Sequence, residues 1–156
     1  MIALIGKCLR FLHTALICIL VVIAVVCGAQ KIAGKQNPMF LGWGCSVVLS
    51  GSMEPNIPTT SLVLIHDANQ IEIGDVVTYI NADNISVTHR VIEIEGDQII
   101  VQGDANPVPD DPINRDQIVG KIEGFCSFLV FPAILIGFLI LTIVVCAWPD
   151  SKTKRE

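Results

Sequence analysis

The chain has 156 residues, which is enough for one domain of ordinary size and not for two. Its hydrophobic fraction of 52% and its charged fraction of 16% exclude a simple soluble domain. The apolar excess lies at the two ends, whereas the central part has an ordinary composition and most of the acidic residues. Because the formal net charge is −5, binding to nucleic acid is not expected.

An apolar run at residues 11–29 follows Lys7 and Arg10. As a helix, its roughly 19 residues span about 30 Å, the thickness of the hydrocarbon core of a membrane. The small residues 27–29 leave a cleavable signal peptide as the alternative, but the run is longer than the apolar core of a signal peptide. We therefore predict a retained transmembrane anchor within region 1–38, together with a cytoplasmic tip and a polar juxtamembrane linker.

Residues 39–45 are apolar but interrupted by glycines, and they include Trp43. Such a segment is expected at the membrane surface. It leads into a polar elbow at residues 50–55 (SGSMEP), where Gly51 permits a sharp bend and Pro55 ends any regular element.

After the elbow, short runs rich in β-branched residues alternate with turns at residues 73–75, 81–84 and 95–97. The runs have no helical pattern between them, which predicts a small antiparallel β domain over residues 39–124. The predicted strands are 61–66, 76–80, 85–94, 98–102 and 118–122. Residues 103–114 are predicted to be a loop.

A second apolar run at residues 125–148 is long enough to span a membrane, with Pro132 as a source of a kink if the helix begins earlier. The tail 149–156 is basic, so the positive-inside rule places it and the amino terminus in the cytoplasm. The predicted fold is mainly β: a small antiparallel catalytic domain on the extracytoplasmic side, flanked by an amino-terminal and a carboxy-terminal transmembrane helix.

The six cysteines do not have the spacing of a disulfide framework or of a zinc site. Four lie in or beside the apolar ends, where cysteine behaves as a small hydrophobic residue: Cys8, Cys18, Cys27 and Cys146. Cys45 and Cys126 flank the β domain, and whether they pair is left open. No metal or other cofactor is expected.

Ser52 lies at the elbow, where hydrolases present a nucleophile, but an ordinary loop serine is the alternative. A serine nucleophile needs a general base. His13 lies in the first apolar run and His66 ends a strand, whereas His89 shares an apolar strand face with Val87 and Val91. His89 is therefore the candidate base, with a half-buried structural histidine as the alternative.

The loop at residues 103–111 contains several carboxylates, one of which could orient the imidazole of His89. A solvated turn and a calcium loop are the alternatives. The ligand spacing of an EF-hand is absent and the flanking elements are strands, so the pattern disfavours calcium.

Taken together, these segments resemble the type I signal peptidases. The resemblance covers residues 45–124 and rests on 50–55 (SGSMEP), 74–77 (GDVV), 89–91 (HRV) and 103–106 (GDAN) with Asp110, in that order and spacing. A histidine stands where the common bacterial enzymes have lysine, so the chain is similar to the branch found in the endoplasmic reticulum, in archaea and in some spore-forming bacteria. No lysine lies between Ser52 and Lys121 that could form a Ser–Lys dyad.

The resemblance implies that Ser52 is the nucleophile and His89 the general base. It places the two acidic positions of the family on Asp104 and Asp110, with Asp110 orienting His89 and Asp104 supporting the site. Asp111 is the alternative to Asp110, because the prolines of this loop permit an alignment shifted by one residue.

By the same resemblance, the chain is expected to be a membrane-bound serine endopeptidase that removes signal peptides after small residues. The hydroxyl of Ser50 and the backbone N–H of Ser52 are the expected oxyanion donors, and residues 47–49 and Met53 are candidates to line the substrate pockets. The expected partners are the signal peptides of secretory preproteins, membrane lipid and the secretion translocon.

The expected location is the cell membrane, or the membrane of the endoplasmic reticulum in a eukaryote. A general and a narrow set of preproteins are equally compatible with the sequence. Two alternatives belong to other functional classes. One is a catalytically inactive, membrane-anchored β domain that acts as a binding or scaffolding module. The other is a transporter or channel component, which the scarcity of polar residues in the two apolar runs disfavours.

Overall fold

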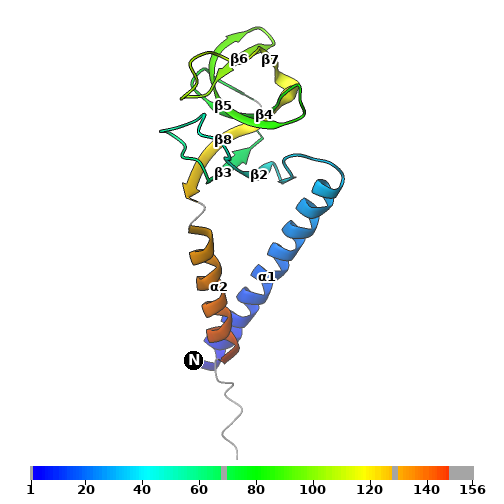
Figure 1. The fold of residues 1–156 in the computed structure, drawn as a ribbon. Coiled ribbons are helices and arrows are strands. Elements are labelled where there is room, and N and C mark those ends of the chain that lie inside the picture. The colour runs from blue at the N-terminus through cyan, green and yellow to red at the C-terminus, as the bar shows by residue number, and fades with distance from the viewer. Residues whose placement is uncertain (1, 68–69, 128–129, 148–156) are drawn as a thin grey trace, which may run out of the picture. The chain divides into compact units, whose positions relative to one another are not determined.

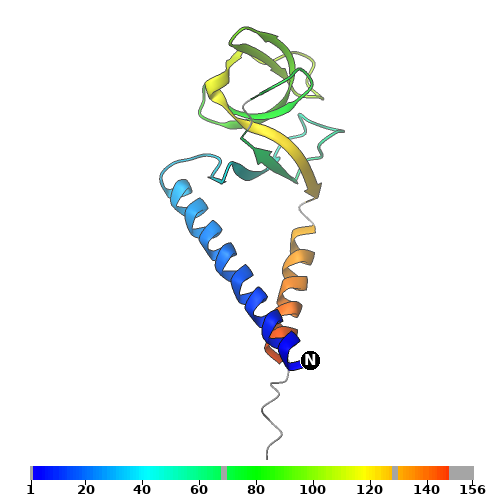
Figure 2. The ribbon, with the colours of Figure 1, turned by 180° about the vertical axis from the view of Figure 1, so that it is seen from behind.

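The computed structural model describes residues 2–67, 70–127 and 130–147, which form two compact units. Of these, residues 2–26 and 130–147 form a helical unit, and residues 27–67 and 70–127 form a β unit. Figures 1 and 2 show the helices and the sheet from opposite sides.

The helical unit contains α1 (Ile2–Ile32), whose last turns belong to the β unit, and α2 (Val130–Ala147). Within α1, the 27 residues Gly6–Ile32 have a mean hydropathy of 2.7 and are long and apolar enough to cross a membrane. No other helix of the described residues reaches that length, since the apolar segment of α2 is Pro132–Val145. The predicted first span therefore has a matching helix, whereas the second span stays a prediction.

The start of the second helix was predicted wrongly. Residues 125–127 continue a strand, and α2 begins only at Val130. Pro132 is the third residue of α2, where its missing N–H removes no hydrogen bond within the helix, so the sequence provides no reason for a kink there. Residues 148–156, including the basic tail, lie outside the described residues.

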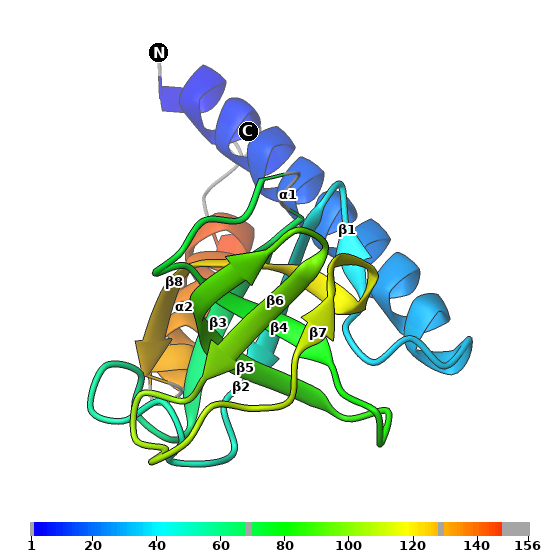
Figure 3. The same cartoon turned by 90° about the horizontal axis from the view of Figure 1, so that it is seen from above.

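The β unit is a single eight-stranded sheet with the strand order β1-β2-β3-β8-β4-β5-β6-β7, in which all neighbours are antiparallel. Figure 3 shows β4, β5 and β6 side by side, as that order requires. The strands are β1 (Met39–Phe40), β2 (Trp43–Val47), β3 (Ser61–His66), β4 (Val76–Ile80), β5 (Ser86–Glu95), β6 (Gln98–Gln102), β7 (Ile113–Asn114) and β8 (Ile118–Ser127), with a short 3-10 helix at Arg115–Gln117. The predicted antiparallel β domain is confirmed.

The alternation of apolar residues explains the sheet locally. In β3, Val63 and Ile65 are fully buried, while Leu64 between them is 44% exposed. β8 enters the sheet between β3 and β4, and it approaches β3 very closely at Gly120. A Cβ atom at Gly120 would lie 2.4 Å from the carbonyl oxygen of His66, so only glycine fits there.

Three strands were not predicted, and two have shifted ends. Residues 39–45, predicted as a surface segment, form β1 and the start of β2, joined by a turn in which Leu41 and Gly42 have positive φ. β7 lies inside the predicted loop 103–114. β8 runs five residues past its predicted end, and β5 is displaced by one residue.

Cys45 and Cys126 are free and exposed. Cys45 lies opposite Leu64 and Cys126 opposite Leu62, so the two cysteines belong to strands on either side of β3. Strands are about 4.8 Å apart, which places these cysteines about 10 Å apart, beyond the reach of a disulfide.

Two apolar clusters form the core of the β unit. The first contains Ile71, Val77, Tyr79, Val91, Ile99, Val101 and Ile113, and the second contains Val48, Met53, Ile57, Val63 and Ile65. Met53 is fully buried in the second cluster. Its side chain packs in the core, whereas it was expected from the sequence to line a substrate pocket.

Candidate active site

The elbow is a compact turn held by local backbone hydrogen bonds. Glu54 N–H donates to the carbonyl of Gly51 (3.1 Å), and Ile57 N–H donates to that of Met53 (2.9 Å). The φ of Gly51 is outside the left-handed region, and a Cβ atom there would come no closer than 3.6 Å to its neighbours. The bend therefore does not depend on a glycine at position 51, contrary to the expectation from sequence.

Ser52 is half-buried, and its hydroxyl oxygen lies 3.2 Å from that of Ser50. Its carbonyl accepts the N–H of Ala105 (2.9 Å), which fastens the elbow to the loop that follows β6. The approach is close at Gly103, where a Cβ atom would lie 2.7 Å from the carbonyl oxygen of Ser52 and 2.9 Å from the side chain of Asn106. A glycine is required at position 103 for this contact.

His89 lies in β5 opposite Val77 of β4, and it is 6% exposed. Its Nδ1 is hydrogen-bonded to Oδ2 of Asp110. Since an ionised carboxylate can only accept, the neutral imidazole carries its proton on Nδ1, and Nε2 remains an acceptor. This is the protonation state that a general base needs.

Tyr79 is the third member of this cluster. Its hydroxyl donates to the same oxygen of Asp110 at 2.5 Å, and its ring centroid is 6.3 Å from that of His89. Burial, followed by the hydrogen bond to Asp110, raises the pKa of Tyr79 well above its usual value, so the hydroxyl remains a donor. The backbone N–H of Asp110 donates to the carbonyl of Val101 (2.9 Å), which fixes the loop next to β6.

Asp104, the second predicted acidic residue, contacts a different set of side chains. Arg90 donates to both of its oxygens, from Nε and Nη2, at 2.8 Å each, and Asn56 donates to Oδ2 at 2.8 Å. The hydrogen bonds from Arg90 are the main reason that the pKa of Asp104 is lowered. Arg90 also donates from Nη1 to the carbonyl of Gly74 (2.8 Å), so Asp104 belongs to a brace between the elbow, β5 and the loop before β4.

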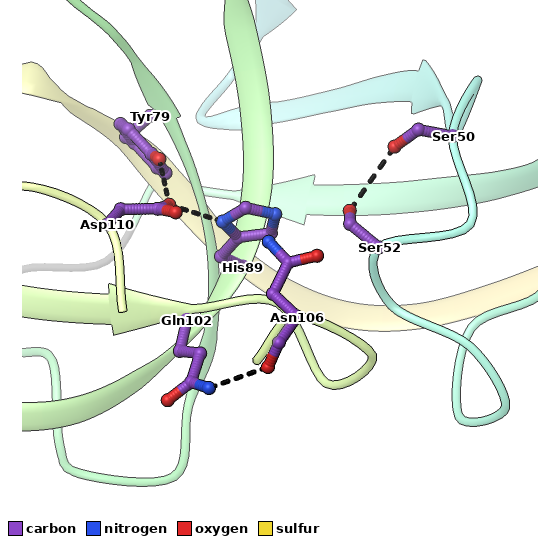
Figure 4. Close-up of polar contacts among 7 residues, drawn as sticks. All are labelled: Ser50, Ser52, Tyr79, His89, Gln102, Asn106 and Asp110. Atoms are coloured by element: carbon purple, nitrogen blue, oxygen red, sulfur yellow. Dashed lines mark hydrogen bonds and ion pairs between the residues drawn. The ribbon is translucent and has the colours of Figure 1, made fainter. Parts of the chain in front are cut away.

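Three of the candidate residues, Ser50, Ser52 and His89, line one groove of about 660 Å³, whereas Asp104 and Asp110 are not among its lining residues. Ser50, Ser52, His89 and Asn106 line one part of it, and residues 46–49 and 85–88 form its two sides. Figure 4 shows Ser52 facing Ser50, and His89 with Asp110 on one side and the side chain of Asn106 on the other. Among the hydrogen bonds of the described residues, the hydroxyl of Ser52 is paired with Ser50 and not with His89.

The other candidates from the sequence lie elsewhere. His66 stacks on Trp43 with ring centroids 4.2 Å apart, and His13 packs against Phe138 in the helical unit. Asp111 is exposed, and among the described contacts it has no hydrogen bond to His89. In the part of the chain that the structure describes, no three histidine, cysteine or acidic side chains are grouped as metal ligands.

Sequence reasoning missed Tyr79, although a signal was present. It is the only tyrosine of the chain and shares a strand face with the apolar Val77. A tyrosine on a buried face needs a partner for its hydroxyl. The sequence therefore indicated a polar partner near this strand, but not which one.

Comparisons with known proteins identify the family to which the chain is similar. The Peptidase S24-like family matches residues 43–123, just over half of the chain. The chain is 31% identical over 124 residues to signal peptidase I W of Bacillus subtilis (strain 168), covering 74% of this chain and 65% of that protein. It is 32% identical over 121 residues to the signal peptidase complex catalytic subunit SEC11 of Candida albicans (strain WO-1), covering 68% and 69%.

A third relative is the signal peptidase complex catalytic subunit SEC11 of Chaetomium globosum, which is 31% identical over 107 residues. That match covers 58% of this chain and 62% of the relative. The chain thus spans slightly less than two thirds of the length of the first relatives that it matches.

Proposed function

The chain belongs to the signal peptidase family, within the Peptidase S24-like group, and from that premise we propose that it is a membrane-bound serine endopeptidase. Its proposed reaction is the removal of amino-terminal signal peptides from secreted preproteins. The observation that supports this best is the groove in which Ser52 and His89 both lie, with His89 held by Asp110.

In the proposed mechanism, the hydroxyl oxygen of Ser52 attacks the carbonyl carbon of the scissile bond. Nε2 of His89 accepts the hydroxyl proton and later gives it to the departing amine. A water molecule then hydrolyses the acyl-enzyme by the same transfers, which restores Ser52. Asp110 holds the proton of the neutral ring on Nδ1. It also stabilises the imidazolium that forms in each step.

Charge develops on the carbonyl oxygen during the attack, and it needs donors that are already in place. The proposed donors are the backbone N–H of Ser52 and the hydroxyl of Ser50, which lies 3.2 Å from the nucleophilic oxygen. In other serine hydrolases, loss of one such donor costs about 3–4 kcal/mol of transition-state stabilisation.

The hydroxyl of Ser52 has to leave Ser50 and turn toward His89 before it can react. Hydrogen bonds between catalytic groups are often formed only when substrate is bound, so the pairing of Ser52 with Ser50 is compatible with the proposed role. The same rotation frees the Ser50 hydroxyl to donate to the oxyanion. One rotation would thus bring Ser52 to its general base and leave Ser50 free as an oxyanion donor.

The sides of the groove suit an extended peptide. Residues 46–49 and residues 85–88 run along it, and both supply backbone groups to which a strand can pair. The apolar side chains of Val47, Val48 and Leu49 line it and are the proposed walls of shallow pockets for small residues. Met53 is excluded from that role by its burial.

The proposed topology keeps the cytoplasmic tip, anchor and linker in region 1–38 and the extracytoplasmic peptidase domain in 39–124. The second span, predicted over 125–148, is now assigned to α2, and 149–156 is the proposed cytoplasmic tail. A signal peptide reaches such an enzyme in the bilayer, so an anchor such as α1 confines both to one surface and raises their effective concentration. Lipid and the translocon are the proposed further partners.

The test is to incubate the purified full chain in detergent with a secretory precursor and to sequence the amino terminus of the product. Wild type is expected to cleave after a small residue, while Ser52→Ala and His89→Ala lose at least about 10³-fold in rate. His66→Ala is the matched control for the histidine and is expected to retain activity. Unchanged processing by Ser52→Ala would favour the inactive binding module instead.

A further inference from the structure

The groove of the candidate active site does not end at the β strands. It is also lined by Lys31, in the last turn of α1, and by Gln36 and Asn37, which belong to the linker between α1 and β1. The segment that connects the anchor to the sheet is therefore also a wall of the groove that contains Ser52 and His89.

This linker is held in place by hydrogen bonds within the β unit. The side chain of Gln30 pairs with the backbone of Met39. Nε2 of Gln30 donates to the carbonyl of Met39 (2.7 Å), and Oε1 accepts the N–H of Met39 (3.0 Å). Nδ2 of Asn37 donates to the hydroxyl of Ser86 (2.8 Å), and Nε2 of Gln36 donates to the carbonyl of Asn84 (3.1 Å). The wall is thus fixed to the first residue of β5, the strand that also holds His89.

The polarity of the wall is set by Asn37. This residue is 9% exposed, and its amide nitrogen is used by Ser86. Among the described residues, no donor reaches its side-chain oxygen, which is therefore available to accept an N–H from an extended peptide. A nearly buried and hydrogen-bonded side chain cannot move aside easily, so this part of the groove has little room for a bulky residue.

The distance between Asn37 and the catalytic residues along the groove follows from the spacing of residues in β5. Ser86 and His89 are three positions apart in β5, which corresponds to about 10 Å at the rise of an extended chain. A substrate strand beside β5 therefore reaches Asn37 about four residues from the scissile bond. Because the apolar core of a signal peptide lies in the membrane and α1 joins the groove at Lys31, the amino-terminal side of the substrate points to this part of the groove.

We propose that Gln36 and Asn37 form a substrate subsite for polar, extended residues four and five positions before the scissile bond. The subsite sets how many residues separate the cleaved bond from the membrane-embedded core of the substrate. This inference rests on the proposed function and names a feature of the substrate that the same groove selects.

The first test measures kcat/KM for precursors that carry a single tryptophan at each position from −7 to −4. With wild type, tryptophan at −4 or −5 is expected to lower kcat/KM about tenfold, equivalent to about 1.4 kcal/mol, with a smaller effect at −7. Asn37→Ala is expected to relieve the loss at −4 and −5 while leaving selectivity at −3 and −1 unchanged. Gln98→Ala, an exposed glutamine at the start of β6, is the control and should keep the wild-type profile.

A second test does not need cleavage. A photoreactive residue replaces the exposed Gln36 in the Ser52→Ala variant, and the sites of its crosslinks to a bound precursor are mapped by mass spectrometry. Crosslinks at −4 and −5 support the subsite, with the same probe at position 98 as the control. Crosslinks beyond the scissile bond, or none at either position, would overturn it.

The two tests separate the two proposals. If wild type cleaves the precursors but tryptophan is tolerated equally at all four positions, the subsite is wrong and the peptidase function stands. If wild type does not cleave at all, the proposed function fails, and the crosslinks still decide whether the linker contacts the peptide.

Discussion

Asp104 and Asp110 belong to one loop, yet the fold uses their carboxylates in opposite ways. Asp104 accepts from Arg90 and Asn56, and its partners hold the elbow to the strands. Asp110 accepts from His89 and Tyr79 at a single oxygen, next to the groove. The first carboxylate has a cation as its main partner, whereas the second has a neutral imidazole and a hydroxyl.

The partners of each carboxylate determine what it can contribute to the protein. A carboxylate paired with a permanently charged guanidinium is largely neutralised, so it contributes mainly to structure. A carboxylate that faces an imidazole gains most when that ring becomes charged, which happens only during the reaction. We therefore expect the two residues to separate cleanly in experiments on activity and on stability.

The largest expected effect is that of Asp110→Asn on activity. The amide cannot hold the proton on Nδ1 of His89 in the same way, so we expect kcat to fall by about 10³- to 10⁴-fold, as in other serine peptidases. The melting temperature should change little because the side chain remains of similar size. Precursor cleavage and thermal unfolding of the purified chain in detergent measure both quantities.

The neighbouring Asp111→Asn is the matched control, since Asp111 is exposed. It is expected to retain wild-type kcat. A large loss for Asp111→Asn together with normal activity of Asp110→Asn would reverse the assignment of the two residues.

The next effect is that of Asp104→Ala on stability. The substitution removes three hydrogen bonds and leaves the guanidinium of Arg90 without its carboxylate, so we expect the free energy of unfolding to fall by about 2–3 kcal/mol. At a temperature where the variant is folded, kcat should remain within about tenfold of wild type. Denaturant unfolding of the full chain, combined with cleavage assays, measures this. A loss of activity as large as that of Asp110→Asn, without a loss of stability, would contradict the comparison.

A smaller effect is expected for Tyr79→Phe. The variant keeps the buried ring and removes only the hydroxyl that donates to Asp110, a hydrogen bond to a charged group that is typically worth about 1.5–3 kcal/mol. We expect kcat to fall about tenfold with an unchanged KM, because Tyr79 positions the carboxylate and does not line the Ser52 groove. A rise in KM at constant kcat would indicate a role in substrate binding instead.

The resemblance in sequence placed Asp110 beside His89, but it gave neither the partners of Asp104 nor the contact of Tyr79 with Asp110. Local patterns, an elbow between strands and a histidine on an apolar strand face, made Ser52 and His89 candidates, and the resemblance to a family assigned their roles. Whether Asp110 or Asp111 faces the histidine is hidden by the prolines of the loop, which interrupt any alternation. It is decided by a long-range contact, the hydrogen bond from the N–H of Asp110 to the carbonyl of Val101.

The missed elements have a similar explanation. β1 and β7 have two residues each, too few for any period to be visible in the sequence. The linker joins the groove through Asn37 and Ser86, which are 49 positions apart, and such pairings are formed by the tertiary fold. Tyr79 reaches Asp110 only because β4 pairs with β5 in the register that places Val77 opposite His89.

The smallest expected effect is a difference in how the stability of two variants depends on pH. The hydrogen bonds from Arg90 lower the pKa of Asp104 in the folded chain below its unfolded value of about 3.9. Between the two values the unfolded state binds more protons, so stability falls as the pH decreases. This contribution of Asp104 is fully present above the unfolded pKa, and it is lost as the pH falls through the folded pKa.

Asp104→Asn removes this titration. Wild type should therefore lose more unfolding free energy than Asp104→Asn between about pH 5 and pH 2, when both are unfolded by denaturant in the same detergent. The exposed Asp111→Asn should follow wild type over that range. The difference is expected to be modest because the ion pair is partly exposed to solvent, and it should shrink at high salt. Parallel curves of unfolding free energy against pH for wild type and Asp104→Asn would mean that the carboxylate of Asp104 gains nothing from Arg90. Asp104 and Asp110 would then not differ in the way that their contacts indicate.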